Sequence, residues 1–341
     1  MKDIIRVGVA GCGGISGVHI PVLMALEGVK ITAVCDINPE RAQKAAEKTG
    51  ADIARDFFEL VKRDDVDSVH VLVPHYLHAP LAITALNAGK NVLTEKPMAT
   101  TLDDARKMVE AANASKGRLG VIFQNRYNPA SVELKRLVAS GIGGKFVGAR
   151  MSVCWHREAP YYNMSGWRGF MATEGGGTLI NQSIHTLDLL TYIAGRQFKR
   201  VRGHVSTDVL GDKIEVETTA NAVAEYEDGA KCVMYMTNDY AIDAPIMLEM
   251  TCENKRWQII GDKLYDVTNG YELLLDGAAP SLNEKAYWGA GHAAEISDFY
   301  DALRTGRPFM LENGEAFSAL SLVKSIQKSS QTGDWVELEK L

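Results

Sequence analysis

The feature that most constrains this chain is a short β-branched run that passes directly into a glycine-rich turn. Residues 7–17 read VGVAGCGGISG, and a helical pattern follows them. Glycines allow a tight turn and let backbone N–H groups approach a pyrophosphate at a helix N-terminus, where the helix dipole favours anions. Asp36 ends the next apolar run, where a carboxylate can hydrogen-bond both ribose hydroxyls of an adenosine.

This order of strand, turn, helix, strand and acid predicts a dinucleotide-binding site. Ser16 occupies the third glycine position of the motif, so the motif taken alone also fits an ordinary tight turn. The residues expected to contact the dinucleotide here are Gly11, Cys12, Gly13, Gly14, Ile15 and Asp36.

Length and charge limit the class of protein. The 341 residues suit two domains that each bury a core. The net charge is −6 with both signs interspersed, so no basic stripe is available for nucleic acid. No apolar run approaches the roughly 20 residues that span a bilayer, and no apolar leader precedes the first strand. We expect a cytoplasmic protein without a membrane partner. The five scattered cysteines predict neither a disulfide framework nor a structural zinc site.

The predicted fold is α/β with two domains, 1–122 and 123–341. The first alternates short strands with amphipathic helices, which predicts a parallel sheet covered on both faces. Its expected strands are 4–10, 30–35, 68–73, 91–94 and 119–122, and its expected helices are 14–26, 39–49, 56–63, 76–88 and 101–115.

The second domain has a different pattern, because strands follow one another without intervening helices. This predicts a mainly antiparallel open sheet with helices on one face, and self-association is the simplest way to cover the other face. Its expected strands are 145–155, 199–207, 216–227, 230–238, 246–252, 256–260 and 271–275, and its expected helices are 129–140, 178–194, 292–304 and 313–329.

Two segments follow strands of the parallel sheet, where ligands bind in such folds. Pro74-His75-Tyr76-Leu77-His78 follows one strand, and Glu95-Lys96-Pro97 follows the next. Partial desolvation of Lys96 would lower its pKa toward that of a useful acid or base, although a solvated loop lysine is the alternative. His75 and His78 have H-x-x-H spacing, but no third ligand has a sensible spacing, so no metal is expected.

A second group of polar residues follows Gly175-Gly176-Gly177. Three glycines let another backbone or a ligand come close, and Asn181, His185 and Asp188 form one stripe of the predicted helix. A polar stripe on a largely buried helix is costly unless it faces a polar cavity or is internally paired. The alternative for His185 is a core histidine with satisfied hydrogen bonds.

The loop before the glycines is rich in aromatic residues. Tyr161, Tyr162, Trp167 and Arg168 suit a sugar ring with its hydroxyl or acidic groups, and ordinary anchoring of the loop is the alternative.

These motifs, in this order, resemble the glucose–fructose oxidoreductase/inositol dehydrogenase/rhizopine-catabolism family of NAD(P)-dependent sugar and cyclitol dehydrogenases. The most specific are Glu95-Lys96-Pro97 and the three glycines followed by His185 and Asp188. The resemblance implies a Rossmann domain joined to an open-sheet α/β domain, a cis Lys96–Pro97 bond, and homodimers or homotetramers assembled through that sheet.

The resemblance also implies roles for individual residues. Lys96 and His185 become the proton-handling pair. The residues implied near the nicotinamide half of the cofactor are Pro74, His75, His78, Glu95 and Asn125. Those implied at the substrate are Lys96, Arg126, His156, Tyr161, Trp167, Arg168, Asn181 and His185. Two departures from the pattern are His75, where the family often has asparagine, and Asn181, where it often has aspartate. Since asparagine cannot act as a base, Asn181 is expected to orient a sugar hydroxyl.

The resulting hypothesis is hydride transfer between a secondary ring hydroxyl and nicotinamide, with carbon 3 of a hexoside as one option. Asp36 favours NAD over NADP because a carboxylate repels a 2′-phosphate, although Arg41 lies nearby in the sequence. Two alternatives remain open. One is an enzyme that cleaves glycosides by transient oxidation and recycles its NAD, and the other is a non-catalytic nicotinamide- and sugar-binding regulator.

Overall fold

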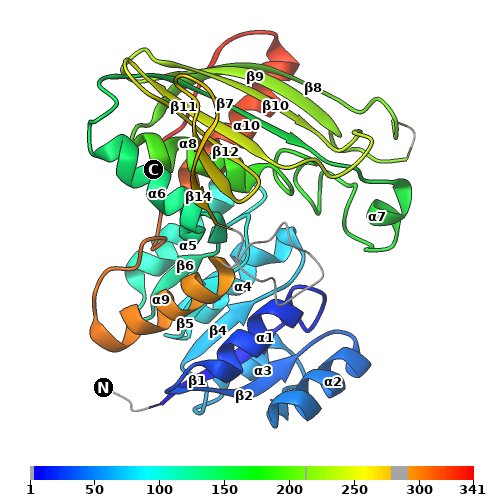
Figure 1. The fold of residues 1–341 in the computed structure, drawn as a ribbon. Helices are drawn as coiled ribbons and strands as arrows, with labels where there is room; N and C mark the ends of the chain where they lie inside the picture. The colour runs from blue at the N-terminus through cyan, green and yellow to red at the C-terminus, as the bar shows by residue number, and fades with distance from the viewer. Residues whose placement is uncertain (1–3, 212, 278–290) are drawn as a thin grey trace. The chain divides into compact units, whose positions relative to one another are not determined.

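A computed structural model describes residues 4–211, 213–277 and 291–341. The chain forms two compact units, residues 1–123 with 292–316, and residues 124–291 with 317–341. Figure 1 shows the helices and strands of both units.

The first unit is built on a six-stranded parallel sheet of order β3-β2-β1-β4-β5-β6. Its strands are β1 (Ile5–Ala10), β2 (Val29–Cys35), β3 (Asp52–Ile53), β4 (Ser68–Val71), β5 (Asn91–Thr94) and β6 (Leu119–Val121). The central strands are buried, as a sheet covered by helices on both faces requires. The expected Rossmann-type α/β arrangement is confirmed, and only the two-residue edge strand β3 was missed.

The helices of this sheet follow local capping chemistry. They are α1 (Ser16–Ala25), α2 (Pro39–Thr49), α3 (Phe57–Lys62), α4 (His75–Asn87) and α5 (Leu102–Ala114). The side chain of Asn38 accepts hydrogen bonds from the first backbone N–H groups of α2, and Thr101 does the same for α5. Gly50 ends α2 at a φ of 70°, which a glycine adopts without strain.

A late segment of the chain, 292–316, belongs to the first unit, although the sequence assigned it to the second domain. It contains most of α9 (Gly291–Thr305). Gly120 on β6 allows this packing, because a Cβ there would lie 2.9 Å from the Phe309 ring and 3.1 Å from that of Phe299. Arg118 and Glu312 add a bidentate ion pair with both distances at 2.6 Å. These contacts are non-local, so helical periodicity could not place the segment.

The second unit contains a nine-stranded sheet of order β14-β13-β12-β11-β7-β10-β9-β8-β15. Only the β7–β10 pair is parallel among these described strands, so the expected mainly antiparallel sheet is confirmed. The strands are β7 (Phe146–Cys154), β8 (Phe198–Ser206), β9 (Thr219–Tyr226), β10 (Lys231–Thr237), β11 (Met247–Cys252), β12 (Arg256–Ile260), β13 (Lys263–Asp266), β14 (Glu272–Asp276) and β15 (Val336–Glu337).

The longer helices of this unit pack on the sheet. The unit contains the 3-10 helix η1 (Gln124–Tyr127) and helices α6 (Pro129–Ala139), α7 (Ala159–Asn163), α8 (Ile184–Ala194) and α10 (Phe317–Thr332). In Figure 1, α8 and α10 lie on the same side of this sheet. The predicted helix 178–194 was wrong at its start, because α8 begins only at Ile184. Residues 178–183 form turns held by bonds such as Thr178 N–H to the Glu217 carbonyl, at 3.0 Å.

Apolar residues remain exposed on one face of this sheet. Val223 and Val233 are cross-strand partners on β9 and β10, and Tyr235 lies two residues further along β10. The residues that alternate with them on β10, Cys232, Met234 and Met236, are buried. Across the described parts of the chain, every helix is too short or too polar to traverse a lipid bilayer.

Candidate functional site

The glycine-rich turn leaves β1 with its backbone accessible. Gly11 has a φ of 95°, and a Cβ there would lie 2.2 Å from the carbonyl oxygen of Leu72, so glycine is required for packing. Gly13 and Gly14 differ, because a Cβ at either position would meet no atom within 4 Å. The backbone of these two residues is therefore open to a ligand just before α1 begins at Ser16.

Asp36 is held by the turn that it was expected to face. Its carboxylate accepts the backbone N–H of Cys12 at 2.7 Å and that of Asn38 at 2.8 Å. Each oxygen keeps acceptor capacity, so the group can still bind ribose hydroxyls. Burial, followed by the nearby Asp36, raises the pKa of the Cys12 thiol to about 11, so this cysteine is neutral and a poor nucleophile.

The Lys96 segment is fastened by a buried histidine. Lys96 follows β5 by two residues, and the Lys96–Pro97 bond is cis, as the resemblance implied. The ring nitrogens of His78 lie 2.7 Å from the Pro97 carbonyl and 2.8 Å from that of Val73. His78 therefore stabilises the conformation of the loop. A contact between His78 and the cofactor stays a prediction. Pro74 and His75 open α4, and His75 is buried.

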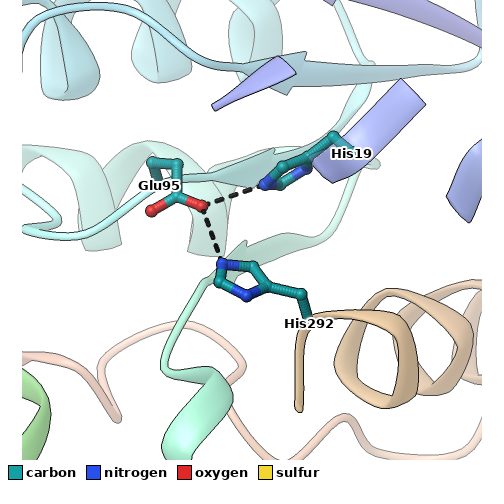
Figure 2. Close-up of side chains that lie close together, drawn as sticks. All are labelled: His19, Glu95 and His292. Atoms are coloured by element: carbon teal, nitrogen blue, oxygen red, sulfur yellow. Dashed lines mark hydrogen bonds and ion pairs between the residues drawn. The ribbon is translucent and has the colours of Figure 1, made fainter. Parts of the chain in front are cut away.

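Glu95 is buried in an imidazole cluster inside this unit (Figure 2). His19 Nε2 lies 2.9 Å from Glu95 Oε1, and His292 Nε2 lies 3.6 Å from the same oxygen. The second oxygen accepts the Lys96 backbone N–H at 3.3 Å. Burial alone would raise the pKa of Glu95, but the hydrogen bonds from His19 and His292 outweigh it and hold that pKa well below its ordinary range.

The cluster continues into the core through two further rings. His19 Nδ1 lies 2.9 Å from His70 Nδ1, and His70 Nε2 lies 2.9 Å from the Tyr300 hydroxyl. The His70 and Tyr300 rings are stacked, with an interplanar angle of 5°. Burial lowers the pKa of both His19 and His70, so both imidazoles are neutral at physiological pH.

These histidines are a part of the site that the sequence analysis missed. His19, Glu95 and His292 place three potential metal-ligand atoms within 4.8 Å of one another, whereas the H-x-x-H spacing in the sequence pointed only to His75 and His78. Their positions in the sequence have no ligand spacing, because they come from α1, the end of β5 and the start of α9. A histidine between two valines of a central strand, His70, was the one signal available.

In the second unit, the three glycines make room for another backbone. A Cβ at Gly177 would lie 1.9 Å from the Glu217 carbonyl oxygen, and the Glu217 carboxylate accepts the Gly177 N–H at 2.9 Å. The sequence left open whether these glycines let a ligand or another backbone come close. In the structure, the backbone of Glu217 makes this close approach. Lys324 donates to the Gly175 carbonyl at 2.6 Å from α10, and burial lowers its pKa to about 8.

Beside this turn, amide groups join Glu174 to the aromatic loop. Asn181 Nδ2 donates to Glu174 Oε1 at 2.6 Å and to the Tyr161 hydroxyl at 3.2 Å, and Gln182 Nε2 donates to the same hydroxyl at 2.8 Å. Burial raises the pKa of Glu174 to about 7. Both hydrogens of the Asn181 amide nitrogen are therefore engaged within this unit.

The predicted polar stripe is divided by the late start of α8. Asn181 lies in the preceding turns, His185 is the second residue of the helix, and Asp188 is paired internally. Arg126, expected at the substrate, donates from Nε and Nη2 to the Asp188 carboxylate at 2.7 and 2.6 Å, with both side chains buried. This pair is the compensation that a buried polar stripe requires.

Of the other residues predicted at the substrate, His156, Trp167 and Arg168 lie in the second unit. The Arg168 guanidinium lies 4.6 Å from the ring centres of Tyr161 and of Trp167. His156 is exposed and donates to the Tyr240 carbonyl at 2.6 Å, which raises its pKa. Asn125 lies in η1. Lys96 and His185 belong to different units, so their pairing remains a prediction.

Two sequence models of protein families match this chain. The model described as "Oxidoreductase family, NAD-binding Rossmann fold" matches residues 5–123, and the GFO/IDH/MocA C-terminal domain matches residues 131–264. Together they cover more than half of the chain. The predicted NAD-binding Rossmann domain is thereby confirmed.

Similar proteins include dehydrogenases of ring substrates. Inositol 2-dehydrogenase of Rubrobacter xylanophilus is 35% identical over 62% of this chain, which spans 58% of that relative's length. D-glucoside 3-dehydrogenase of Escherichia coli is 26% identical over 98% of this chain and 97% of the relative. The WlbA dehydrogenase of Bordetella pertussis, solved with NADH and UDP-GlcNAcA, has a TM-score of 0.87 and 28% identity, covering 99% of this chain and 100% of that one.

Proposed function

This chain belongs to the GFO/IDH/MocA family of oxidoreductases, and from that premise we propose that it is an NAD-dependent dehydrogenase of a sugar, sugar derivative or cyclitol. The reaction is the oxidation of a secondary ring hydroxyl. The observation that carries the proposal is the placement of Lys96 at the carboxyl end of β5, in the same sheet whose first strand ends at the open glycine turn.

The residues of the first unit fit a nicotinamide dinucleotide. The accessible backbone of Gly13 and Gly14 would hold the pyrophosphate, with Cys12 and Ile15 beside it, and Asp36 would bind the adenosine ribose. Pro74, His75, His78 and Glu95 of this unit, together with Asn125 of the second unit, are the proposed residues around the nicotinamide half. The bound nicotinamide supplies the hydride acceptor. The carboxylate of Asp36 disfavours a 2′-phosphate, which supports NAD over NADP.

Lys96 and His185 are the proposed proton-handling pair. As the hydride leaves the carbinol carbon, the hydroxyl must lose its proton, and Lys96 or His185 accepts it. The partner that carries a positive charge then stabilises the developing alkoxide. Asn181 cannot take the proton, because an amide is not a base, and it is proposed to orient a neighbouring hydroxyl of the ring.

The second unit provides the proposed substrate surface. Tyr161 and Trp167 offer ring faces of the kind on which sugars stack, and Arg168 offers a cation between them. Arg126 and His156 are assigned more distant roles, because Arg126 is paired with Asp188 and His156 with the Tyr240 carbonyl. Oxidation at carbon 3 is supported by the glucoside 3-dehydrogenase relative, which matches nearly the whole chain.

We also propose that the protein forms homodimers or homotetramers through its nine-stranded sheet. The exposed Val223, Val233 and Tyr235 form an apolar strip on the face opposite the helices, and a second copy would cover it. Light scattering on a Val223→Lys, Val233→Lys double variant should show a smaller particle than the wild type. An unchanged mass would contradict this assembly.

A substrate screen tests the function. NADH absorbance is followed with inositols, free hexoses, glycosides, and uronic and nucleotide sugars, and Lys96→Ala serves as the inactive control. The proposal expects NAD reduction by at least one compound. Binding without reduction across the panel would instead indicate a nicotinamide-dependent regulator. Release of sugar from an aryl glycoside without NADH accumulation would indicate redox-assisted glycoside cleavage.

A further inference from the structure

A continuous line of buried polar groups in the first unit runs from Glu95 through His19 and His70 to Tyr300, and each successive contact is 2.9 Å. The proposed function assigns a role to Glu95 but none to the other three residues. The Tyr300 hydroxyl lies 3.4 Å from Ser68 Oγ, at the first residue of β4. His19, His70 and Tyr300 have no exposed surface. Buried polar groups are costly unless each hydrogen bond is made, so the positions of these protons are constrained.

With both imidazoles neutral, as their lowered pKa values indicate, only two arrangements of protons satisfy the line. A neutral imidazole carries one N–H, so a His19 that donates from Nε2 to Glu95 must accept at Nδ1 from His70. His70 then accepts at Nε2 from the Tyr300 hydroxyl. In the opposite arrangement, His19 donates from Nδ1 to His70, His70 donates from Nε2 to Tyr300, and His19 Nε2 presents a lone pair toward Glu95.

The carboxylate decides between the two. A lone pair on His19 Nε2 facing a carboxylate oxygen at 2.9 Å would be repulsive, unless a proton or a cation lay between them. A tetrahedral zinc ion would hold its ligand atoms about 3.3 Å apart, given metal–ligand distances near 2.05 Å. The observed separation is shorter and equals the usual length of an N–H···O hydrogen bond. The geometry therefore favours donation from His19 to Glu95.

We propose that His70 and Tyr300 are positioning residues of the cofactor site, which fix the His19 tautomer so that His19 Nε2–H donates to a negatively charged Glu95. Because Glu95 immediately precedes Lys96, this charge lies at the end of β5, where the proposed function places the nicotinamide. Oxidised nicotinamide is a cation and the reduced ring is neutral. The line of hydrogen bonds thus favours NAD⁺ relative to NADH. This second statement rests on the proposed function, whereas the tautomer assignment does not.

Histidine tautomers can be observed directly in the wild-type protein. ¹⁵N-detected NMR of histidine-labelled protein at neutral pH should show His19 protonated at Nε2 and His70 protonated at Nδ1, assigned with His19→Gln and His70→Phe. The opposite tautomers, or one equivalent of tightly bound zinc by elemental analysis whose removal changes them, would overturn the proposal. The adjoining titratable groups are Glu95, His292 and Tyr300, together with His78 and Lys96 near Glu95.

Cofactor affinities test the consequence. His70→Phe keeps a ring against Tyr300 but removes both nitrogens, and Tyr300→Phe removes only the terminal donor. We expect the Kd for NAD⁺ to rise about threefold to tenfold in His70→Phe, the worth of about one net hydrogen bond, and less in Tyr300→Phe. The Kd for NADH should change by less than about twofold. His204→Phe, at an exposed position of β8, is the matched control.

Equal weakening of NAD⁺ and NADH would indicate a merely structural role and overturn the cofactor half of the inference. If the wild type binds neither NAD⁺ nor NADH, both the proposed function and the cofactor half of the inference are wrong. The NMR experiment would still test the tautomers assigned to His19 and His70. Tyr300→Phe retains a full aromatic ring in the core, so it keeps the test available if His70→Phe does not fold.

Discussion

Glu95 in the first unit and Glu174 in the second are both buried carboxyls, yet their environments drive them to different charge states. Glu95 is 7% exposed and Glu174 is 0% exposed, so burial alone would raise both pKa values. Glu95 receives two imidazole contacts and a backbone N–H, and its pKa falls well below the ordinary range. Glu174 accepts the Gly169 backbone N–H and the Asn181 amide N–H, but burial outweighs them and its pKa rises to about 7.

The difference shows that partners, rather than depth, set the charge of these acids. Three donors converge on Glu95 from α1, α9 and its own strand end, so its negative charge is stabilised where Lys96 begins. Near Glu174, the charge of Arg168 lowers its pKa and the charge of Glu217 raises it. Its hydrogen bonds and these charges together do not outweigh the effect of burial. The first unit thus holds a permanent anion, and the second holds an acid that titrates near neutrality.

The largest expected effect concerns the residue beside the permanent anion. Lys96→Ala should lower kcat by about 10²- to 10⁴-fold, the usual worth of a positioned acid or base, while NADH still binds. Steady-state kinetics with a substrate found in the screen measures it, and Lys44→Ala on the exposed face of α2 is the control. Near-wild-type turnover would show that Lys96 takes no part in the mechanism. The end of β5 at Glu95 would then have only a structural role.

The titrating acid should produce a pH dependence of stability. Glu174 ionises near pH 4.5 when unfolded and near pH 7 when folded, so the folded state binds more protons between these values and stability falls as pH rises. Glu174→Gln cannot ionise and should gain up to about 3 kcal/mol relative to wild type between pH 4.5 and 8. Urea denaturation across this range measures the difference, and parallel curves would mean that Glu174 does not titrate there.

Removal of the permanent anion should have the opposite result. Glu95→Gln should lower the free energy of unfolding at pH 7 by about 1.5–3 kcal/mol, because a charged hydrogen-bond acceptor is replaced by a neutral amide. Since the pKa of Glu95 is depressed in the folded state, its contribution is present above about pH 4.5 and disappears as pH falls through the folded pKa. A variant as stable as wild type at pH 7 would contradict the charge assigned to Glu95.

A third carboxylate, Asp36, should show the smallest effect. It is held by two backbone N–H groups, so loss of its side chain removes ribose contacts and frees the Cys12 and Asn38 amides. Asp36→Ala should weaken NADH binding about fivefold to tenfold. The ratio of the NADPH Kd to the NADH Kd should therefore fall. Fluorescence titration with both cofactors measures this, with Asp52→Ala, at the exposed edge strand β3, as the control. Tighter binding of NADPH by the wild type would contradict the NAD assignment.

Much of the first unit could be read from its sequence. The strands and helices around the glycine turn were located to within a few residues, because β-branched runs and caps such as Asn38 and Thr101 act locally. The late start of α8 was missed because residues 178–183 are held in turns by Glu217, a non-local partner. The position of 292–316 was missed for the same reason.

The sequence by itself determined the order of the elements, the glycine turn with Asp36, and the two motifs that contain Lys96 and His185. These follow from interactions over a few residues, which a pattern records. Only the tertiary structure decided the charge states of Glu95 and Glu174 and joined Arg126 to Asp188. Such groups depend on partners distant in sequence, as with His70 and Tyr300, which are 230 residues apart. Desolvation and hydrogen bonding of a buried group are properties of its folded surroundings, so no local pattern contains them.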